Sequence, residues 1–357
     1  MAAGVVLQPE CPERLSPERI VELFGPLTAA RGILLAVSGG PDSVALMLMA
    51  KEWASLLAAA PPVAVATVDH GLRRESWEEA EMVAGFAAAL SLPHTILAWC
   101  GEKPRSRIQE RARDARYALL FQHAYSIGAD YLVTAHHADD QAETVLFRLL
   151  RGSGIAGLAG MPGTSERHGI VLSRPLLSIP KAELVRFCEA RHHPFIRDPA
   201  NQHPSYARTR IRRLARLFAE EGLDAQALRR LGQRAARANA ALERQLEEVV
   251  ARISAKRNPG NFSAHIEELA GQPEEILLRF LADELKVIGA PKALRLDRLE
   301  VVTARLAKSL AAGTPFKTSL GGAIIRFERD YSLLIEKEGE RRRGRKGNLR
   351  RQLSSVT

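Results

Sequence analysis

The chain has 357 residues, more than the roughly 150 of an average domain, and 46% of them are hydrophobic, enough for two sizeable cores. No stretch approaches the roughly 18 uninterrupted apolar residues of a membrane span, and the N-terminus lacks a secretory pattern, so we expect a cytoplasmic protein with no membrane partner. Cys11, Cys100 and Cys188 form neither a disulfide framework nor a CxxC metal pair. A net charge of +10 favours an anionic partner, with nucleic acid first among the candidates.

Short apolar runs alternate with helix-length segments through the first 150 residues. The runs are rich in Val, Ile and Leu and are bounded by turn residues, as strands buried on both faces should be. We predict strands at 32–38, 62–70, 94–100 and 130–137, and helices at 43–58, 75–91, 106–127 and 139–150. This alternation favours an α/β fold with a doubly wound, mostly parallel sheet.

Beyond residue 215 the pattern changes. Helical periodicity dominates to about 312, and residues 320–338 then indicate two strands joined by a turn near Asp330. The predicted organisation is an N-terminal extension with a first helix, an α/β domain, a mostly helical domain that ends in a β-hairpin, and a basic, disordered tail. Their expected bounds are 1–28, 29–217, 218–338 and 339–357.

The segment "LLAVSGGPDSVALM" (34–47) places a short polar turn between a strand and a helix. Such a turn aims backbone N–H groups and the helix dipole at one point, which makes an anion site. It lacks the lysine of the common GxxxxGK[ST] loop and is shorter. A tight turn capped by an aspartate or a serine is the alternative. The predicted phosphate-binding residues are Ser38, Gly39, Gly40, Pro41, Asp42 and Ser43.

Asp42 argues against a plain turn. A carboxylate beside a bound phosphate repels it, unless the carboxylate holds a metal ion or positions a substrate amine. Asp42 therefore indicates Mg²⁺ between its carboxylate and phosphate oxygens, or an ammonium group.

A second motif, "TAHHADDQAETVLF", begins at residue 134. It places two histidines at the end of a strand and three carboxylates at the start of a helix: His136, His137, Asp139, Asp140 and Glu143. A metal site and simple helix capping both fit this composition. Both motifs follow parallel strands, whose carboxyl ends bind ligands in α/β sheets, and this favours a functional site.

Together the motifs resemble those of the PP-loop ATP pyrophosphatases, which adenylate a substrate and release pyrophosphate. "HHADDQAET" is similar to the signature of one branch, the tRNA(Ile)-lysidine synthetases. Further matches follow in order at 68–73, 112–117, 151–161, 174–177, 197–202 and 208–212. Departures are Asp69, where asparagine is more usual, and Thr209, which interrupts an Arg-Asn-Arg pattern. We also expect the chain to lack the extra C-terminal domain of longer members.

The resemblance implies ligation of lysine to the wobble cytidine of the isoleucine tRNA with anticodon CAU. The oxygen on carbon 2 of cytosine attacks the α-phosphate of ATP and releases pyrophosphate. The ε-amine of free lysine then attacks carbon 2, displaces AMP and leaves lysidine, which changes codon reading from AUG to AUA. The implied cofactors are ATP and Mg²⁺. Many family members are dimers, so the resemblance also allows a homodimer.

The resemblance assigns roles to individual residues. As catalytic residues we predict Asp42, His136, Asp140 and Arg113. Asp42 would place Mg²⁺ or the lysine ammonium, and Arg113 would neutralise the adenylate or contact the lysine carboxylate. His137, Asp139 and Glu143 are predicted to support them. Arg208, Arg210, Arg212 and Arg213 are predicted tRNA contacts, with a solvated arginine face as the alternative.

Two other functions fit parts of the sequence. A tRNA thiolase uses the same ATP loop but needs reactive cysteines, and Cys100 and Cys188 are not in a paired motif. A nucleotide-dependent RNA-binding module would need no carboxylates beside the phosphates, because burying acids there weakens ATP binding.

Overall fold

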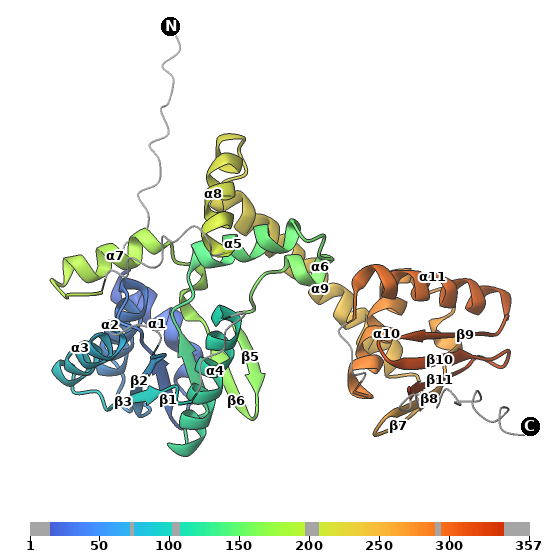
Figure 1. The fold of residues 1–357 in the computed structure, drawn as a ribbon, viewed down its shortest axis with the longest axis horizontal. Helices are drawn as coiled ribbons and strands as arrows, with labels where there is room; N and C mark the ends of the chain where they lie inside the picture. Colours follow the sequence, from blue (N-terminus) through green and yellow to red (C-terminus); the bar gives the residue numbers. More distant parts are fainter. Residues whose placement is uncertain (1–14, 72–74, 102–107, 197–206, 290–293, 339–357) are drawn as a thin grey trace, which may run out of the picture. The chain divides into compact units, whose positions relative to one another are not determined.

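The computed structural model describes residues 15–71, 75–101, 108–196, 207–289 and 294–338. The tail at 339–357 and most of the N-terminal extension lie outside this part of the chain. The chain divides into two compact units, Met1–Ala236 and Arg237–Thr357. The first is drawn in blue to yellow and the second in yellow to orange-red (Figure 1).

The first unit contains a six-stranded sheet in the order β3-β2-β1-β4-β6-β5. The strands are β1 (Ile33–Ala36), β2 (Val63–Asp69), β3 (His94–Ala98), β4 (Tyr131–Thr134), β5 (Thr164–Arg167) and β6 (Ile170–Ser173). All neighbours are parallel except β5, which runs antiparallel to β6. The doubly wound, mostly parallel sheet predicted from the sequence is thus confirmed. The β5–β6 hairpin at its edge was not predicted.

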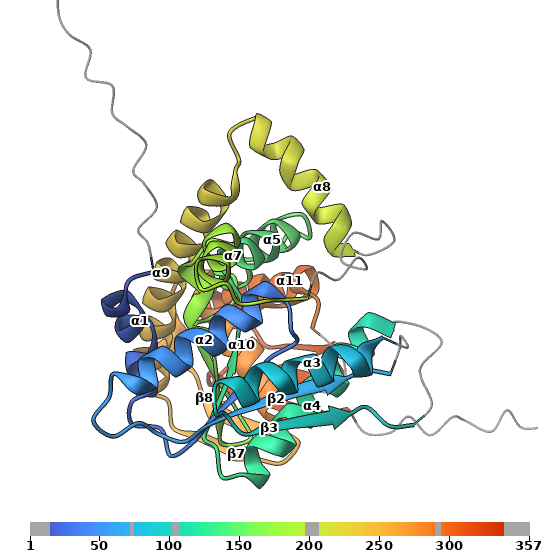
Figure 2. The same cartoon turned by 90° about the vertical axis from the view of Figure 1, so that its left-hand side faces the viewer.

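Helices cover both faces of this sheet (Figure 2). Those of the first unit are α1 (Pro17–Phe24), α2 (Pro41–Ser55), α3 (Ser76–Ala89), α4 (Ile108–Ser126), α5 (Ala138–Leu149), α6 (Ile155–Leu158), α7 (Lys181–Ala190), α8 (Ala207–Glu220) and the start of α9 (Ala225–Val250), with short 3₁₀ turns at Gly25–Leu27 and Pro175–Ser178. Leu35 of β1 packs with α1, α2 and α7, whereas its neighbour Leu34 packs with α4 on the opposite face. The apolar run of β1 is explained by this two-sided burial.

The boundary between the two units falls inside α9, later than the expected boundary at 217. The reason is a small apolar cluster in which Ile211 of α8 and Leu228 of α9 pack with Val145 of α5. A change in composition marks where helical periodicity begins. It does not mark which core a helix joins.

The second unit packs two helices on an antiparallel sheet in the order β7-β8-β11-β10-β9. Its elements are β7 (Ala255–Asn258), β8 (Asn261–His265), α10 (Glu274–Val287), α11 (Leu296–Ala312), β9 (Phe316–Leu320), β10 (Ala323–Phe327) and β11 (Ser332–Lys337), with a 3₁₀ turn at Glu267–Leu269. The predicted hairpin is β10–β11. β7, β8 and β9 join it and were not predicted. β7, for example, reads "AKRN" and carries no apolar alternation. In the described part of the chain, no helix is long and apolar enough to cross a membrane.

Candidate active site

The two sequence motifs meet because of the strand order. β1 lies between β2 and β4, so the chain leaves the sheet in opposite directions on either side of it. Ala36 at the end of β1 pairs with Thr134 at the end of β4. The turn after β1 and the histidines after β4 therefore start side by side, at the position where α/β sheets bind ligands.

The turn after β1 depends on glycine at position 39. Gly39 has a φ of 84°, a backbone conformation that L side chains rarely adopt, and a Cβ there would overlap Cδ1 of Ile196. The Ile196 N–H donates to the Gly39 carbonyl at 2.8 Å. The Ser43 hydroxyl accepts from the Ser38 N–H at 3.1 Å and reaches the Gly40 carbonyl at 3.0 Å. These contacts hold the turn in one conformation.

The N-terminus of α2 is open toward the same point. Gly40 is the N-cap residue, and no side chain caps the first turn. A Cβ built on Gly40 would meet no atom within 4 Å, so there is open space beside the turn. Uncapped N–H groups at the positive end of a helix dipole attract anions. The arrangement is that of a phosphate-binding turn.

Asp42 and His137 form the centre of the site. His137 Nε2 lies 3.5 Å from Asp42 Oδ2 and 3.5 Å from Asp140 Oδ2, and its side chain is 4% exposed. On the other side of the ring, Nδ1 accepts a hydrogen bond from the backbone N–H of Asp140 at 3.3 Å. The backbone N–H of His137 in turn donates to Asp140 Oδ2 at 3.2 Å. This pair caps α5 while it faces Asp42. His137 and Asp140 therefore cap α5 and also form part of the site.

A cation from a distant segment completes this centre. Lys181, the first residue of α7, places its Nζ 3.2 Å from Asp42 Oδ2. Its backbone N–H donates to Asp139 Oδ2 at 2.8 Å. Asp139 is therefore occupied as a cap of α7, and Lys181 and His137 both lie against Asp42.

These contacts shift the ionisation of both partners. Burial raises the pKa of Asp42, but His137 and Lys181 outweigh it and hold that pKa below its usual range. Burial lowers the pKa of His137, but Asp42, Asp140 and Asp139 outweigh it and raise that pKa above its ordinary value. The carboxylate and the imidazole therefore stabilise each other's charged forms.

His136 lies in a different environment from its neighbour. Its Nδ1 hydrogen-bonds the Thr134 hydroxyl at 2.8 Å. Burial lowers its pKa to about 3, against the opposing effect of Asp140 and with a further contribution from Arg174 and Arg113. The pKa values of the two adjacent histidines are thus shifted in opposite directions.

Asp42 has the atom that a cation would need. Its second oxygen, Oδ1, is buried and has no hydrogen-bond partner. Mg²⁺ is held in many sites by one or two carboxylates together with substrate phosphates and water. The described residues contain no group of three or more His, Cys, Asp or Glu side chains that could hold a metal. One carboxylate beside a phosphate-binding turn fits Mg²⁺ delivered with a nucleotide, and it fits an ammonium group equally well.

Comparison with known proteins agrees with this geometry. The family model of the PP-loop domain, an ATP-binding domain, matches residues 13–217. A tRNA(Ile)-lysidine synthase from Methylobacterium sp. (strain 4-46) is 46% identical over 341 residues, which is 93% of this chain and 98% of the relative. Another from Bradyrhizobium diazoefficiens is 40% identical over 351 residues, 93% of this chain and 97% of that relative.

The chain belongs to the tRNA(Ile)-lysidine synthase family. This membership confirms the resemblance seen in the motifs. Among solved structures, the U34-tRNA thiolase NcsA from Methanococcus maripaludis with its [4Fe-4S] cluster matches with a TM-score of 0.52 at 15% identity, covering 62% of this chain and 77% of that one. That similarity concerns the fold alone. Cys100 is exposed and Cys188 is buried in this lysidine synthase family member, and Cys11 lies outside the described residues.

The other predicted residues lie at varying distances from this centre. Glu143 accepts a hydrogen bond from Arg212 Nε at 2.6 Å, so one predicted tRNA contact is paired within the protein. Arg210 and Arg213 are exposed on α8, and the side chain of Arg208 lies outside the described residues. Arg113 is exposed on α4, with its guanidinium carbon 5.1 Å from the centre of the Tyr117 ring.

Two residues of the site were missed by the sequence reasoning. Lys181 reaches Asp42 across 139 positions, and only the packing of α7 on α2 brings them together. Arg174 follows β6 and acts on His136 through its charge. The one available signal was their position in family-like segments, since "RPLL" begins at Arg174 and Lys181 follows it closely.

Proposed function

We propose that the protein ligates L-lysine to carbon 2 of the wobble cytidine in the isoleucine tRNA with anticodon CAU, and that it uses ATP and releases AMP and pyrophosphate. One observation carries the proposal. The phosphate-binding turn and the Asp42–His137–Lys181 cluster meet at one point, with the neutral His136 beside them. Family membership supports the same reaction.

The adenylation step needs a site for the leaving pyrophosphate. The uncapped N–H groups at the start of α2 and the turn at Ser38–Gly40 supply preorganised donors for that anion. Asp42 would hold Mg²⁺ through Oδ1, and the ion would neutralise phosphate charge as ATP reacts. Arg113, on α4 beyond the turn, is proposed to balance the charge of the adenylated cytosine.

The second step needs a neutral lysine amine, because an ammonium group is not a nucleophile. His136 has a pKa of about 3 and is a weak proton acceptor, so it would serve as a neutral hydrogen-bonding partner of the base. We assign the proton to the Asp140 carboxylate, which lies beside His137 at the start of α5. In this scheme Asp139 and Glu143 position α7 and α8 through Lys181 and Arg212.

The anionic partner is tRNA in this proposal. The net charge of +10 and the exposed arginines of α8 support phosphate contacts. Arg208, Arg210 and Arg213 remain the proposed contacts. The reaction would take place in the cytoplasm, and the family resemblance supports a homodimer.

Incorporation of labelled lysine into an unmodified CAU-anticodon isoleucine tRNA transcript tests the proposal. We expect label in that tRNA only, with AMP and pyrophosphate formed in equal amounts. The methionine tRNA with the same anticodon and a reaction without ATP are the controls. Asp42→Ala should abolish incorporation, and near wild-type activity would remove Asp42 from the mechanism.

Other outcomes point to the alternative functions. Pyrophosphate release without lysine transfer would keep the ATP site and reject lysine as the second substrate. A thiolase would release pyrophosphate only with its own tRNA and a sulfur donor. Absence of turnover by well-folded protein would favour a nucleotide-dependent RNA-binding module.

A further inference from the structure

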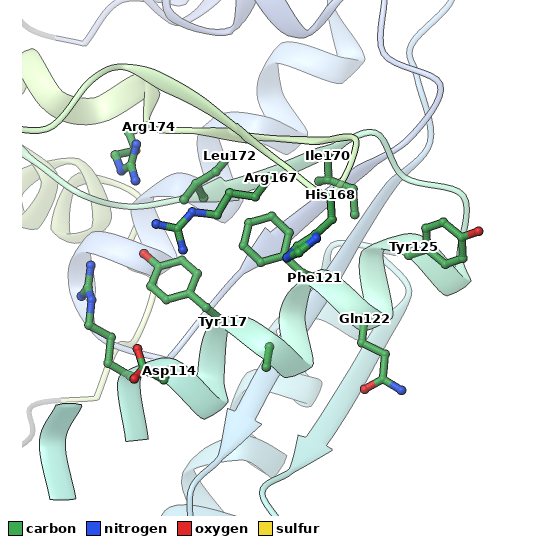
Figure 3. Close-up of a pocket in the computed structure, with 12 residues that line it drawn as sticks. Asp114, Tyr117, Phe121, Gln122, Tyr125, Arg167, His168, Ile170, Leu172 and Arg174 are labelled. Carbon is green, nitrogen blue, oxygen red and sulfur yellow. The ribbon is translucent and has the colours of Figure 1, made fainter. Parts of the chain in front are cut away.

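A cavity of about 660 Å³ lies on the α4 side of the sheet, between α4 and the β5–β6 hairpin (Figure 3). We call it the α4–β6 pocket. Its aromatic and cationic lining comprises Arg113, Tyr117, Phe121, Tyr125, Arg167, His168 and Arg174. The volume is in the range of small-molecule and nucleotide sites.

The pocket contains an aromatic wall. Tyr117, Phe121 and Tyr125 follow one another at intervals of four residues on α4, and such positions share one face of a helix. Tyr117 and Phe121 have ring centroids 6.2 Å apart, and His168 meets Phe121 edge-on at 6.3 Å. Tyr125 is 79% exposed. An aromatic surface of this kind, open to solvent, is what stacked nucleobases use.

His168 is held in an unusual backbone conformation at the tip of the hairpin. Its φ is 54°, followed by Gly169 with a φ of 74°, as in a two-residue turn of the type that suits asparagine or glycine. A histidine at this position carries backbone strain, and strained residues cluster at binding sites. The imidazole of His168 lies against Phe121 in the lining of the pocket.

The lining of the pocket carries more positive than negative charge. Its lining has three arginines against one aspartate, Asp114. Within the described part of the chain, no carboxylate forms an ion pair with Arg113, Arg167 or Arg174. Figure 3 shows Arg167 extending from the hairpin toward the hydroxyl end of Tyr117. Like charges gathered without counter-ions repel one another, and a bound anion would relieve that repulsion.

Arg174 shows this most clearly. Its Nη1 donates to the Pro162 carbonyl at 2.9 Å, but its Nε is buried without a hydrogen-bond partner. Burial lowers its pKa, and Arg113 and Arg167 lower it further against the opposing effect of Tyr117. A phosphate oxygen would supply the missing partner and the missing charge.

The pocket adjoins the candidate active site. Arg113 and Arg174 line the pocket, and both also act on the imidazole of His136 through their charge. Because β6 runs parallel to β4, Arg174 leaves the sheet beside Thr134 and the histidines. A polynucleotide with one base at His136 would therefore place a neighbouring nucleotide at the pocket.

We infer that the α4–β6 pocket binds a nucleotide that adjoins the modified cytidine in the anticodon loop, with its base against Tyr117 and His168 and its phosphate among Arg113, Arg167 and Arg174. The inference rests on the proposed function and names a second RNA subsite for it. Free lysine fits less well, because its ammonium would face three arginines and the single carboxylate of Asp114 in this pocket.

Steady-state kinetics with separate variation of tRNA, lysine and ATP tests the subsite. His168→Asn removes the ring but keeps a residue that tolerates the left-handed conformation, and Arg167→Gln removes one charge. Each should raise the KM for tRNA by about 5- to 20-fold, as loss of one stacking or phosphate contact does, while kcat and the KM for ATP stay near wild type. Arg31→Gln is the matched control, since Arg31 is exposed at the opposite end of β1.

A fluorescence measurement reports on stacking directly. Two transcripts carry 2-aminopurine, one on each side of the wobble cytidine. Wild-type protein should quench one of them, and His168→Asn, Arg167→Gln and Tyr117→Leu should restore its fluorescence at saturating protein, whereas Arg31→Gln should not.

The outcomes separate the subsite from the proposed function. If wild-type protein forms lysidine and the variants change neither the KM for tRNA nor the quenching, the subsite is wrong and the function stands. A rise in the KM for lysine alone would assign the pocket to the amino acid and overturn the inference. If wild-type protein forms no lysidine, the proposed function fails, and the fluorescence alone decides on the pocket.

Discussion

The ammonium of Lys181 lies 3.2 Å from the carboxylate of Asp42, although the two residues are 139 positions apart. Lys181 starts α7 and Asp42 lies in the first turn of α2, so the contact joins two helix N-termini at the end of the sheet where the parallel strands finish. It leaves Oδ1 of Asp42 as the oxygen without a partner. One oxygen of Asp42 thus faces the protein's own cation, and the other is the proposed contact for Mg²⁺ or an ammonium group.

Removal of this lysine should favour the incoming cation. In Lys181→Met, Asp42 loses one competing positive charge, so we expect the half-saturating Mg²⁺ concentration for pyrophosphate release to fall about 2- to 5-fold. A half-exposed ion pair contributes up to about 1 kcal/mol, which sets that range. Lys51→Met, further along α2, is the control. An unchanged Mg²⁺ dependence would show that Lys181 does not compete at Asp42.

The two glycines of the phosphate-binding turn should differ in their response to alanine. Gly39→Ala places a Cβ against Ile196 at a φ of 84°, and we expect it to destabilise the first unit by roughly 1–3 kcal/mol. Gly40→Ala adds a methyl group in open space at a φ of −68°, so its stability should change by less than about 1 kcal/mol. Urea unfolding followed by tryptophan fluorescence measures both. Equal losses would contradict the assignment of the strain to Gly39.

Local patterns in the sequence were sufficient to predict the strands and helices in the first 150 residues of the first unit. The four predicted strands and the helices between them are present, because each run such as 32–38 is buried on both faces and bounded by turn residues. β5 and β7 were missed because "TSER" and "AKRN" are short, polar edge strands without a hydrophobic period. Their pairing depends on a neighbouring strand that local sequence does not identify.

The site was predictable as two motifs, but its contacts were not. The strand-then-turn pattern at 34–47 and 130–144 indicated that both motifs lie at carboxyl ends of parallel strands. The resemblance placed His136 among the catalytic residues and His137 in support, but local sequence did not show how their surroundings differ. His136 bonds Thr134, whereas His137 faces Asp42. The pairing of Arg212 with Glu143 likewise arises from the packing of α8 on α5.

The adjacent histidines should affect stability with opposite pH dependence. The folded pKa of His136 is lowered to about 3 from 6.5, so its contribution is present above pH 6.5 and is lost as the pH falls. The folded pKa of His137 is raised, so its contribution is present below pH 6.5 and is lost as the pH rises through that raised value. Between pH 7 and 5, His136→Asn should gain stability relative to wild type by roughly 1–2 kcal/mol, and His137→Gln should lose it.

Tryptophan fluorescence is a suitable probe, because Trp53, Trp77 and Trp99 all lie in the first unit with both histidines. Urea unfolding at pH 5, 6, 7 and 8 gives the slope for each variant. His192→Asn, at an exposed position just after α7, is the control for a histidine outside the site. Parallel slopes for the His136 and His137 variants would reject the opposite pKa shifts.

Neighbouring arginines of α8 should contribute unequally to tRNA binding. Arg212 is paired with Glu143, so its charge is already balanced, whereas Arg213 is exposed and the described residues offer it no carboxylate partner. Each phosphate contact changes the slope of log Kd against log salt by about 0.7 to 0.9. We expect Arg213→Gln to reduce the slope by about that amount and Arg212→Gln to reduce it by less than half as much. Filter binding of the isoleucine tRNA between 50 and 200 mM salt measures this range. An unchanged slope in Arg213→Gln would remove that arginine from the interface, and a larger change in Arg212→Gln would mean that tRNA displaces Glu143 from its partner.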